Sequence, residues 1–423
     1  MTRASILSDE LVRQLVAVGQ VDILVGLPTF NNAGTIETLV QRLHVGLAKF
    51  FPRERTVIIN ADGGSDDGTP DLLRHAPMAE EEMRGSASLR TTHRVSATYA
   101  GLPGRAGGVR TVFAAADLLQ ARAVVLIDPT ITSMTPEWLA GLAQPLAKNE
   151  ADLVLPVHPR GRFEGPLLNQ LARPLLSAVY GRRLRSNMAG TFGCSGRFAS
   201  RMVRHPMWER DLTGPALDVW LVATAMAEDL RLTQSYVGPS VVAPHGARPG
   251  LSELFQQVVG TTFLCMEQHA NVWKGLAEAF DVPVLGTPHH TDTPDPALDL
   301  APMVERFRTG VRDLAPLLRD IVSPETLARL QAAAQSEASV RVPDPLWAIT
   351  VYEFAAAAHQ GVMNREHLTQ ALVPLYLGRT ASFFAEIASA DESAHTQRLA
   401  ALEREFEGLR PYLVERWNVE GRR

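Results

Sequence analysis

The chain has 423 residues and a formal net charge of −5, which excludes a generally basic surface of the kind that binds nucleic acids or membranes. Hydrophobic residues make up 46% and charged residues 21% of the chain, a balance typical of a globular protein with a large core. The two cysteines, Cys194 and Cys265, exclude a disulfide framework, and we expect both to be buried.

The N-terminus, MTRASILSDELVRQLVAVGQ, lacks the apolar core of a signal peptide. No stretch approaches the ~20 apolar residues that a membrane-spanning helix needs. We therefore expect a cytoplasmic protein with no membrane span and no nucleic-acid partner.

Short apolar runs alternate with helical patterns through the first half of the chain. Strands are predicted by the runs at 21–28, 56–62, 123–129 and 151–159. Helices are predicted between them by apolar residues at helical spacing, as at 35–51 and 134–148. This alternation indicates a Rossmann-like α/β fold, a mostly parallel sheet with helices on both faces.

The second half of the chain is mainly helical. A further strand is predicted at 235–244, followed by a long helical pattern at 251–280. The Pro- and Asp-rich stretch at 284–300 is interpreted as a linker, and helical patterns fill the rest. We therefore predict a catalytic domain at 1–285 and a C-terminal helical domain at 286–423.

Ligands of such sheets bind outside the carboxyl ends of the strands. Polar, turn-rich segments follow the predicted strands at 28–31, 62–64, 128–130 and 158–160. In the segment at 62–69, DGGSDDGT, the glycines permit close backbone approach, and Asp62 could accept a hydrogen bond from a base or ribose. Asp66 and Asp67 are interpreted chiefly as turn or helix-capping residues.

A Gly-rich stretch with Arg105 and Arg110, PGRAGGVRTVFAAADLL, opens a predicted helix. Backbone amides at a helix start together with an arginine suit a diphosphate. The stretch matches neither the P-loop nor the dinucleotide-binding glycine pattern.

Three further residues carry two readings each. Asp128 ends a strand and could bind a divalent metal or a ribose, or could be a turn residue before proline. Asp218 begins an apolar helix as either a capping residue or a poised carboxylate. His245 lies in a Gly/Pro-rich loop, where a surface role competes with a ligand role.

The order of these pieces resembles the retaining GT-A glycosyltransferases that make glucosyl-3-phosphoglycerate, mannosylglycerate and glucosylglycerate. The resemblance covers roughly residues 21–275. Its motifs are LPTFNNAGTI, NADGGSDDGT, GRAGGVRTVFAAA, VVLIDPTITSMTPEWLAGLAQPL, LLNQLARPLLSAVYG, MAGTFGCSGRFASRMV, ALDVWLV and VVAPHGARPG.

The resemblance implies a role for each motif. It implies that the nucleotide sugar is bound by Pro28, Thr29, Phe30, Asn31, Asp62, Gly63, Arg105, Asp128, Gly190 and Arg248. Asp218 would lie near the reacting sugar as the catalytic carboxylate. Asp128 and His245 would hold a divalent metal, Mg²⁺ or Mn²⁺, and Arg160 and Thr191 would contact the acceptor.

The sequence departs from the family pattern at several places. Thr130 replaces the second acid of the Asp-x-Asp metal motif, and Arg105 replaces a lysine. The residues that hold the acceptor phosphate in phosphoglycerate-specific members fall at about Pro166 and Leu168, which argues against a strictly phosphorylated acceptor. Arg160 instead resembles the arginine that holds the glycerate carboxylate.

We therefore predict a retaining glycosyltransferase that moves glucose or mannose from a UDP- or GDP-sugar to D-glycerate or a related small hydroxy acid, including 3-phosphoglycerate. Helical extensions of this group imply a homodimer. The alternative is a catalytically impaired sugar-nucleotide sensor or scaffold, suggested by Thr130. A polyprenyl phosphate acceptor is a third reading, disfavoured because the chain has no membrane-binding segment.

Overall fold

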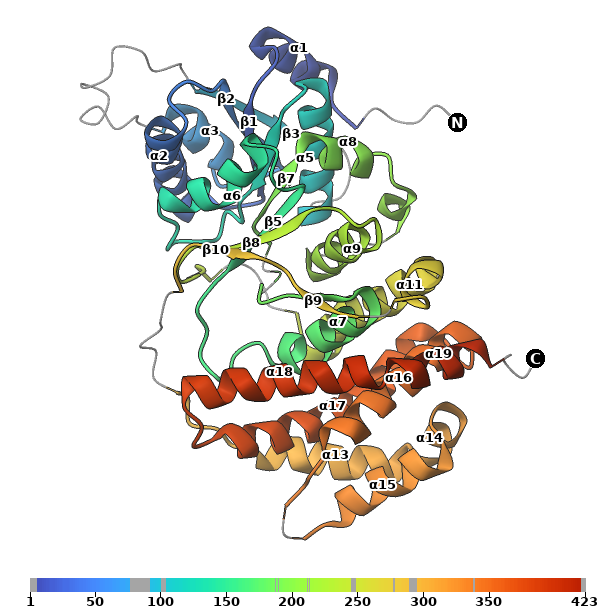
Figure 1. The fold of residues 1–423 in the computed structure, drawn as a ribbon. Helices are drawn as coiled ribbons and strands as arrows, with labels where there is room; N and C mark the ends of the chain where they lie inside the picture. The colour runs from blue at the N-terminus through green and yellow to red at the C-terminus, as the bar shows by residue number, and fades with distance from the viewer. Residues whose placement is uncertain are drawn as a thin grey trace.

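The structure is a computed structural model, and it describes residues 6–76, 92–99, 104–186, 188, 190–210, 212, 214–244, 249–276, 278–288, 295–337 and 339–419. An eight-stranded sheet lies at the centre of the N-terminal part (Figure 1). In spatial order its strands are β10 (Val284–Leu285), β8 (Leu232–Tyr236), β5 (Leu153–Val157), β7 (Phe192–Ser195), β4 (Ala123–Leu126), β1 (Ile23–Thr29), β2 (Thr56–Asp62) and β3 (His93–Thr98).

Every strand pair of this sheet is parallel except those of β7, which runs antiparallel to both β4 and β5. The central strands are buried along almost their whole length because helices cover both faces. A second, two-stranded sheet pairs β6 (Arg182–Arg183) with β9 (Phe280–Asp281). The predicted fold class, a mostly parallel α/β sheet followed by C-terminal helices, is confirmed.

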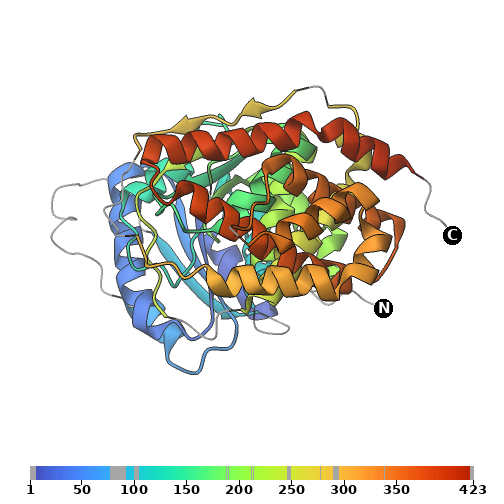
Figure 2. The ribbon, with the colours of Figure 1, turned by 90° about the horizontal axis from the view of Figure 1, so that it is seen from below.

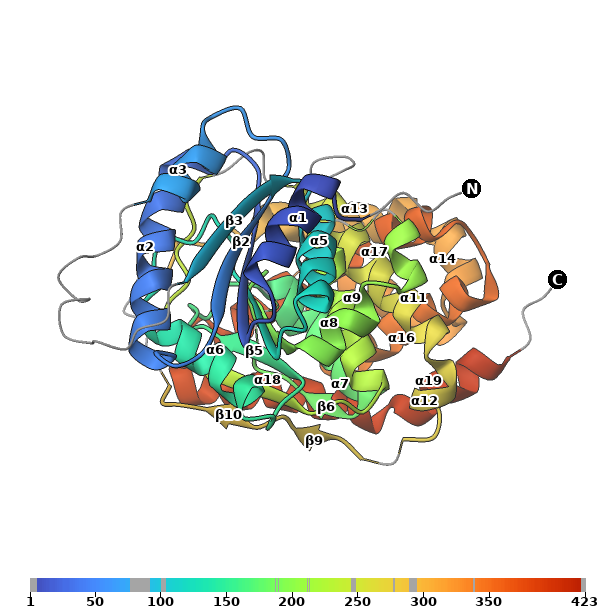
Figure 3. The same cartoon turned by 90° about the horizontal axis from the view of Figure 1, so that it is seen from above.

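Helices cover the sheet in two layers (Figure 3). One layer contains α2 (Ala33–Phe50), α3 (Thr69–His75) and α6 (Glu137–Ala147), which enclose an apolar core against one face. The other contains α1 (Asp9–Val18), α5 (Arg105–Leu118), α8 (Gly196–Met202) and α9 (Gly214–Ala227). Gly26 lets α5 approach β1, since a Cβ there would lie 2.4 Å from Val112 Cγ1.

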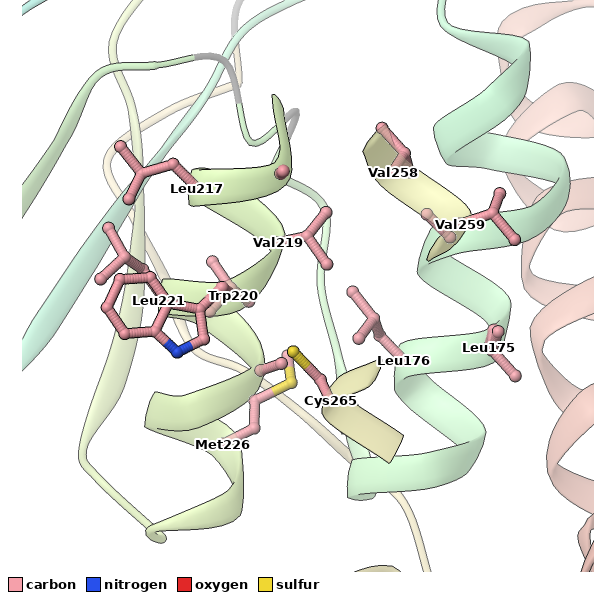
Figure 4. Close-up of a cluster of buried hydrophobic side chains, with 14 of the residues drawn as sticks. Leu175, Leu176, Leu217, Val219, Trp220, Leu221, Met226, Val258, Val259 and Cys265 are labelled. Carbon is pink, nitrogen blue, oxygen red and sulfur yellow. The ribbon is translucent and has the colours of Figure 1, made fainter. Parts of the chain in front are cut away.

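A connecting layer of helices lies between the sheet and the C-terminal helices. It comprises the π-helical turn η1 (Leu168–Ala172), α7 (Arg173–Tyr180), α10 (Leu251–Phe255), the π-helical turn η3 (Gln256–Gly260), α11 (Thr261–Gln268) and α12 (Ala270–Trp273). The 3-10 turn η2 (Pro206–Glu209) instead packs on α5 and α9 through Trp208. Apolar side chains of α7, α9, η3 and α11 meet in one cluster (Figure 4). Cys265 lies in this cluster, and both cysteines are buried and free, as predicted.

The C-terminal helices pack against this connecting layer and cover the molecule when it is seen from below (Figure 2). They are α13 (Ala301–Asp313), α14 (Ala315–Ile321), α15 (Pro324–Gln335), α16 (Asp344–Gln360), α17 (Arg365–Ile387), α18 (Glu392–Gly408) and α19 (Arg410–Asn418). A single apolar core runs from α1 through α9 and α11 to Trp417 in α19. One hydrophobic core continues across residues 285–286. The domain boundary at this place stays a prediction.

Three local expectations were wrong. The strand predicted at 235–244 lies at 232–236, because Gly238 has a φ of +89° and Pro239 follows it. The stretch at 284–300, interpreted as a linker, begins with β10. The helical pattern at 251–280 is divided into α10, η3, α11 and α12 rather than forming one helix.

None of the described helices is both long and apolar enough to cross a membrane.

Candidate active site

The carboxyl ends of β1 and β2 form the first wall of the site. Thr29 and Asp62 are partners in the parallel register, and Thr29 Oγ1 lies 2.9 Å from Asp62 Oδ1. The buried Asp62 carboxylate also accepts hydrogen bonds from the amides of Gly64 and Ser65 and from Ser65 Oγ. Asp62 therefore folds the loop that follows β2, and contact of its carboxylate with a nucleoside stays a prediction.

The loops after β1 and β2 are joined by side-chain hydrogen bonds. Asn31, in the left-handed region at a φ of +56°, donates from its amide to Ser65 Oγ and accepts from the Asp66 amide. Asp67 accepts hydrogen bonds from Ala33 and Thr69, which confirms its predicted role as a turn residue. These hydrogen bonds hold the two loops together as one continuous surface at the carboxyl edge of the sheet.

An aromatic pair flanks Gly63 on this surface. A Cβ at Gly63 would lie 2.9 Å from Tyr99 Oη and 3.3 Å from the Phe30 ring, so glycine lets both side chains approach the backbone closely. Phe30 is 41% exposed, unlike the buried Tyr99. The Phe30 ring is thus available to a planar ligand such as a base. Burial raises the pKa of Tyr99, whose hydroxyl bonds to the backbone of Gly104 at the start of α5.

Close packing fixes the start of α5 against the end of β1. A Cβ at Gly108 would lie 2.6 Å from Pro28 Cβ, and a Cβ at Gly107 would lie 2.7 Å from the Tyr99 ring. The Gly-rich stretch therefore serves close helix–strand contact, and it opens a helix as predicted, with α5 beginning at Arg105. Pro28, a predicted nucleotide-binding residue, forms part of this contact.

Arg105 joins three segments that are far apart in the sequence. Its Nη2 lies 2.6 Å from Asp218 Oδ1 and 2.8 Å from the Gly190 carbonyl oxygen, and its Nη1 lies 3.0 Å from the Gly214 carbonyl oxygen. Its Nε is buried and has no hydrogen-bond partner among the described residues. Both terminal nitrogens of the guanidinium thus donate hydrogen bonds within the protein, whereas Nε donates none to a described residue.

Asp218 lies in the first half of α9 and is 7% exposed. Besides the ion pair with Arg105, its Oδ2 accepts a hydrogen bond of 3.0 Å from the Gly190 amide. Burial raises the pKa of the Asp218 carboxyl, whereas the Arg105 charge and hydrogen bond oppose that rise. Asp218 lies inside α9 and does not cap it, and its role as a poised carboxylate stays a prediction.

A small, mostly apolar cavity lies beside the Asp218 carboxyl group. It lies between β5, β7 and α9 and has room for about one water molecule. The lining is mostly apolar: Leu153, Leu155, Met188, Gly190, Thr191, Phe192, Asp218, Leu221 and Val222. Apolar walls disfavour the charged form of a carboxyl group, and Arg105 is the partner whose charge opposes the resulting rise of the Asp218 pKa.

Asp128 lies opposite Arg105 across Gly190. A Cβ at Gly190 would lie 3.2 Å from Asp128 Oδ2 and 3.5 Å from Arg105 Nε. Asp128 Oδ1 accepts hydrogen bonds from the Thr130 amide and from Thr130 Oγ1, at 2.9 and 2.7 Å. Asp128 Oδ2 accepts none from the residues that the structure describes, so it is available to a ligand.

Thr191 supports Asp128 from behind. It is 2% exposed, and its Oγ1 accepts a hydrogen bond of 3.0 Å from the Asp128 amide. Its role in this structure is to orient Asp128, and its contact with an acceptor stays a prediction. Sequence reasoning missed this support.

The donor set suits a divalent cation only in part. A hard cation that bridges to a diphosphate usually has one or two protein carboxylates, and Asp128 supplies one. The second nearby carboxylate, Asp218, is ion-paired with Arg105. Within the described ranges no cluster of three His, Cys, Asp or Glu side chains could hold a metal ion. His245 and Arg248 lie outside the described residues.

Arg160 lies in the loop that follows β5, on the side of the sheet toward α7. Burial lowers the pKa of its half-buried guanidinium, which forms no hydrogen bond or ion pair with any described residue. A guanidinium of this kind suits a carboxylate or phosphate. The structure thus brings Arg105, Asp128, Gly190, Thr191 and Asp218 together and leaves Arg160 open at a neighbouring strand end.

Solved structures similar to this chain belong to the group that the motifs resemble. One is glucosyl-3-phosphoglycerate synthase from Mycobacterium tuberculosis with phosphoglyceric acid, at 20% identity and a TM-score of 0.43 over 61% of this chain and 84% of that chain. Another holds the same enzyme with Mn²⁺, UDP-glucose and phosphoglyceric acid, at 19% identity and a TM-score of 0.42 over 63% and 86%.

No family model matches the sequence, and no curated protein matches it. The ligands of the solved structures are those of the mycobacterial enzyme.

Restoring the missing acid is expected to strengthen metal binding. Thr130→Asp would place a second carboxylate beside Asp128, and we expect it to tighten Mn²⁺ binding in the presence of UDP by about tenfold, because ligand charge tunes such sites. Paramagnetic titration of Mn²⁺ measures this. Thr132→Asp, at an exposed position two residues further on, is the control. Equal Mn²⁺ affinities of the two variants would contradict the assignment of Asp128.

Gly190→Ala is expected to disturb the site itself. Gly190 has a φ of +80°, and a methyl group would press on Asp128 and Arg105, so we expect loss of about 1 kcal/mol or more in the free energy of unfolding together with weakened nucleotide binding. Gly361→Ala, with a φ of +66° and no atom within 4 Å of its Cβ, should show the backbone cost alone. Urea unfolding and UDP titration separate the two effects.

Proposed function

We propose that this protein is a retaining glycosyltransferase that transfers glucose or mannose from a nucleotide diphosphate sugar to D-glycerate or a related small hydroxy acid, including 3-phosphoglycerate. The observation that carries the proposal is the convergence of Arg105, Asp128 and Asp218 around Gly190. This convergence lies next to the shaped nucleotide loops at the carboxyl edge of a parallel sheet. Such edges bind nucleotides in α/β proteins.

Each part of the site has a role in this proposal. The loops at 28–32 and 62–69 hold the nucleoside, with Phe30 against the base. The Arg105 Nε and the amides at the start of α5 face the diphosphate, where negative charge develops as it leaves. Asp128, with His245, would hold Mg²⁺ or Mn²⁺, and such an ion when bound neutralises the departing diphosphate.

The transfer itself needs two bond changes at the anomeric carbon. The bond to the diphosphate oxygen breaks, and a bond to the acceptor hydroxyl oxygen forms on the same face of the sugar. The hydroxyl proton passes to the departing phosphate oxygen. The Asp218 carboxylate, paired with Arg105, stabilises the positive charge that develops on the sugar. Arg160 binds the carboxylate of the acceptor.

A panel of donors and acceptors tests the proposal. UDP-glucose, GDP-glucose, UDP-mannose and GDP-mannose are each incubated with D-glycerate or 3-phosphoglycerate, with Mg²⁺, Mn²⁺ or EDTA. Nucleotide release and mass spectrometry report transfer, and NMR of the product reports anomeric configuration. Absence of product from every donor–acceptor pair would refute the proposed glycosyltransferase activity. An inverted anomeric centre would refute the retaining mechanism.

The alternative function is a sugar-nucleotide sensor or scaffold. It is favoured by Thr130, whose hydroxyl bonds to Asp128 in the position of a metal-binding acid. Tight, metal-independent nucleotide binding without transfer would support it. A cytoplasmic location and a homodimer stay predictions, which cell fractionation and sedimentation velocity test.

A further inference from the structure

The loop after β5 is fastened to the C-terminal helices by Arg162. Its Nε donates a hydrogen bond of 2.7 Å to Asp295 Oδ2, and its Nη1 donates to the carbonyl oxygens of Ile387, Ala388 and Ala390. These carbonyls end α17, and a cation at a helix C-terminus is favourable both as a hydrogen-bond donor and through the helix dipole. Arg162 thus caps α17 from another part of the chain.

Phe163 fastens the same loop through an apolar contact. Its ring meets Phe384 edge to face, with centroids 5.2 Å apart and an interplanar angle of 84°. Phe163 packs on a small cluster of Phe383, Phe384 and Ile387 that is separate from both main cores. In Figure 1 the green segment between β5 and α7 runs down to these helices. Two adjacent side chains therefore tie one loop to the end of α17.

Arg160 lies two residues before Arg162, and its guanidinium packs closely against the backbone of Gly165. A Cβ at Gly165, which has a φ of +61°, would lie 2.3 Å from Arg160 Nη1, so the turn back at Gly165 packs against the guanidinium. The nearest charges are those of Glu164, which raises the pKa of Arg160, and Arg173, which lowers it. Arg173 is itself paired with Glu403 at 2.9 Å.

A half-buried guanidinium without an ion pair is costly unless an anion completes it. Arg162 and Phe163 attach this loop to the end of α17 two and three residues after Arg160. We propose that the C-terminal helices act as the support of the acceptor site. Arg162 and Phe163 are its positioning residues, and Arg160 binds the carboxylate or phosphate of a small anionic acceptor. This inference rests on the proposed function.

Kinetics of anchor variants test the support. We expect Arg162→Ala and Phe163→Ala each to raise the KM for D-glycerate or 3-phosphoglycerate by about tenfold or more, since small misplacement of a binding group is costly. The donor KM should stay unchanged. Arg162→Lys should rescue only partly, because an ammonium lacks the guanidinium fork. Hydrogen exchange of the amides at 160–166 should quicken in both alanine variants.

Arg365→Ala is the matched control. Arg365 also joins the C-terminal helices to the rest of the chain, through Glu267 at 3.1 Å, and its side chain is 35% exposed against 29% for Arg162. It lies away from the acceptor loop, so its acceptor KM should equal that of the wild type. Unchanged acceptor KM in both anchor variants, unchanged exchange at 160–166, or an equal rise in donor KM overturns the inference.

Failure of the proposed function gives a different result. If the wild type transfers no sugar from any donor, the proposed function fails, and calorimetric titration with D-glycerate and 3-phosphoglycerate decides the inference alone. Weaker anion binding by Arg162→Ala than by Arg365→Ala would agree with Arg162 as a positioning residue of the acceptor site. Equal binding by the two variants, or no binding by the wild type, overturns it.

Discussion

Asp218→Asn is expected to lower kcat by about 10²–10³-fold, because it removes one preorganised charge facing the reacting carbon. Asparagine has nearly the same shape and can still accept the hydrogen bond from the Gly190 amide, but its NH2 group then faces Arg105, so the variant should also lose stability. The loop around Gly190 should therefore keep its position, and the affinity for UDP or GDP should stay largely unchanged. The expected signature is a loss of turnover without a loss of nucleotide binding.

Asp152→Asn provides the comparison for this prediction. Asp152 is also a mostly buried carboxylate paired with arginines, Arg231 and Arg197, but it lies at the start of β5, away from the carboxyl edge. Its replacement should lower stability and spare kcat. Steady-state kinetics of both variants, with nucleotide titration, measure the difference. A wild-type rate for Asp218→Asn would remove this carboxylate from the reaction.

Arg105→Met is expected to be the most destabilising single change at the site. It removes the only cation paired with Asp218 among the described residues, and it frees the carbonyls of Gly190 and Gly214. Breaking a buried ion pair from one side costs about 3–5 kcal/mol in the free energy of unfolding, since it leaves a buried charge. Urea unfolding measures the loss.

The double variant Arg105→Met with Asp218→Asn separates charge from packing. With both charges removed, no buried ion remains, so the double variant should be more stable than Arg105→Met alone. Strict additivity of the two single changes would contradict a direct coupling between these side chains.

The pH dependence of Arg105→Met follows from the raised pKa of Asp218. A carboxyl whose pKa is higher in the folded than in the unfolded state contributes stability at low pH, and this contribution is lost as the pH rises through the folded pKa. Removing Arg105 raises that pKa further. The deficit of the variant relative to wild type should thus be larger at about pH 8 than at about pH 5.

The sequence predicts the sheet well where its strands are continuous apolar runs. The run at 56–62 is β2 to the residue, and the run at 21–28 differs from β1 by one or two residues at each end. β7 could not be predicted, because FGCS is short, follows a glycine-rich loop and pairs antiparallel between two distant strands. Its pairing is fixed by tertiary contacts that leave no periodic pattern.

Motif order predicts the members of the site better than their partners. Asp218 and Arg105 are both foreseeable as site residues, but their ion pair joins positions 113 residues apart and has no local signal. The same limit applies to Arg162 and Phe163, which read as ordinary loop residues until α17 is placed beside them. Thr130 stands out in the sequence as the replaced acid, but its hydrogen bond to Asp128 is visible only in the structure.

The undivided apolar core has a consequence for how the molecule moves. Leu15 in α1, Trp220 in α9 and Trp417 in α19 belong to the same packed cluster. A rigid-body hinge between the sheet and the C-terminal helices would have to pull this interior apart, so we expect ligands to enter and leave through rearrangements of the loops at the sheet edge. Cutting the chain after 285 should accordingly yield an insoluble fragment rather than a smaller working enzyme.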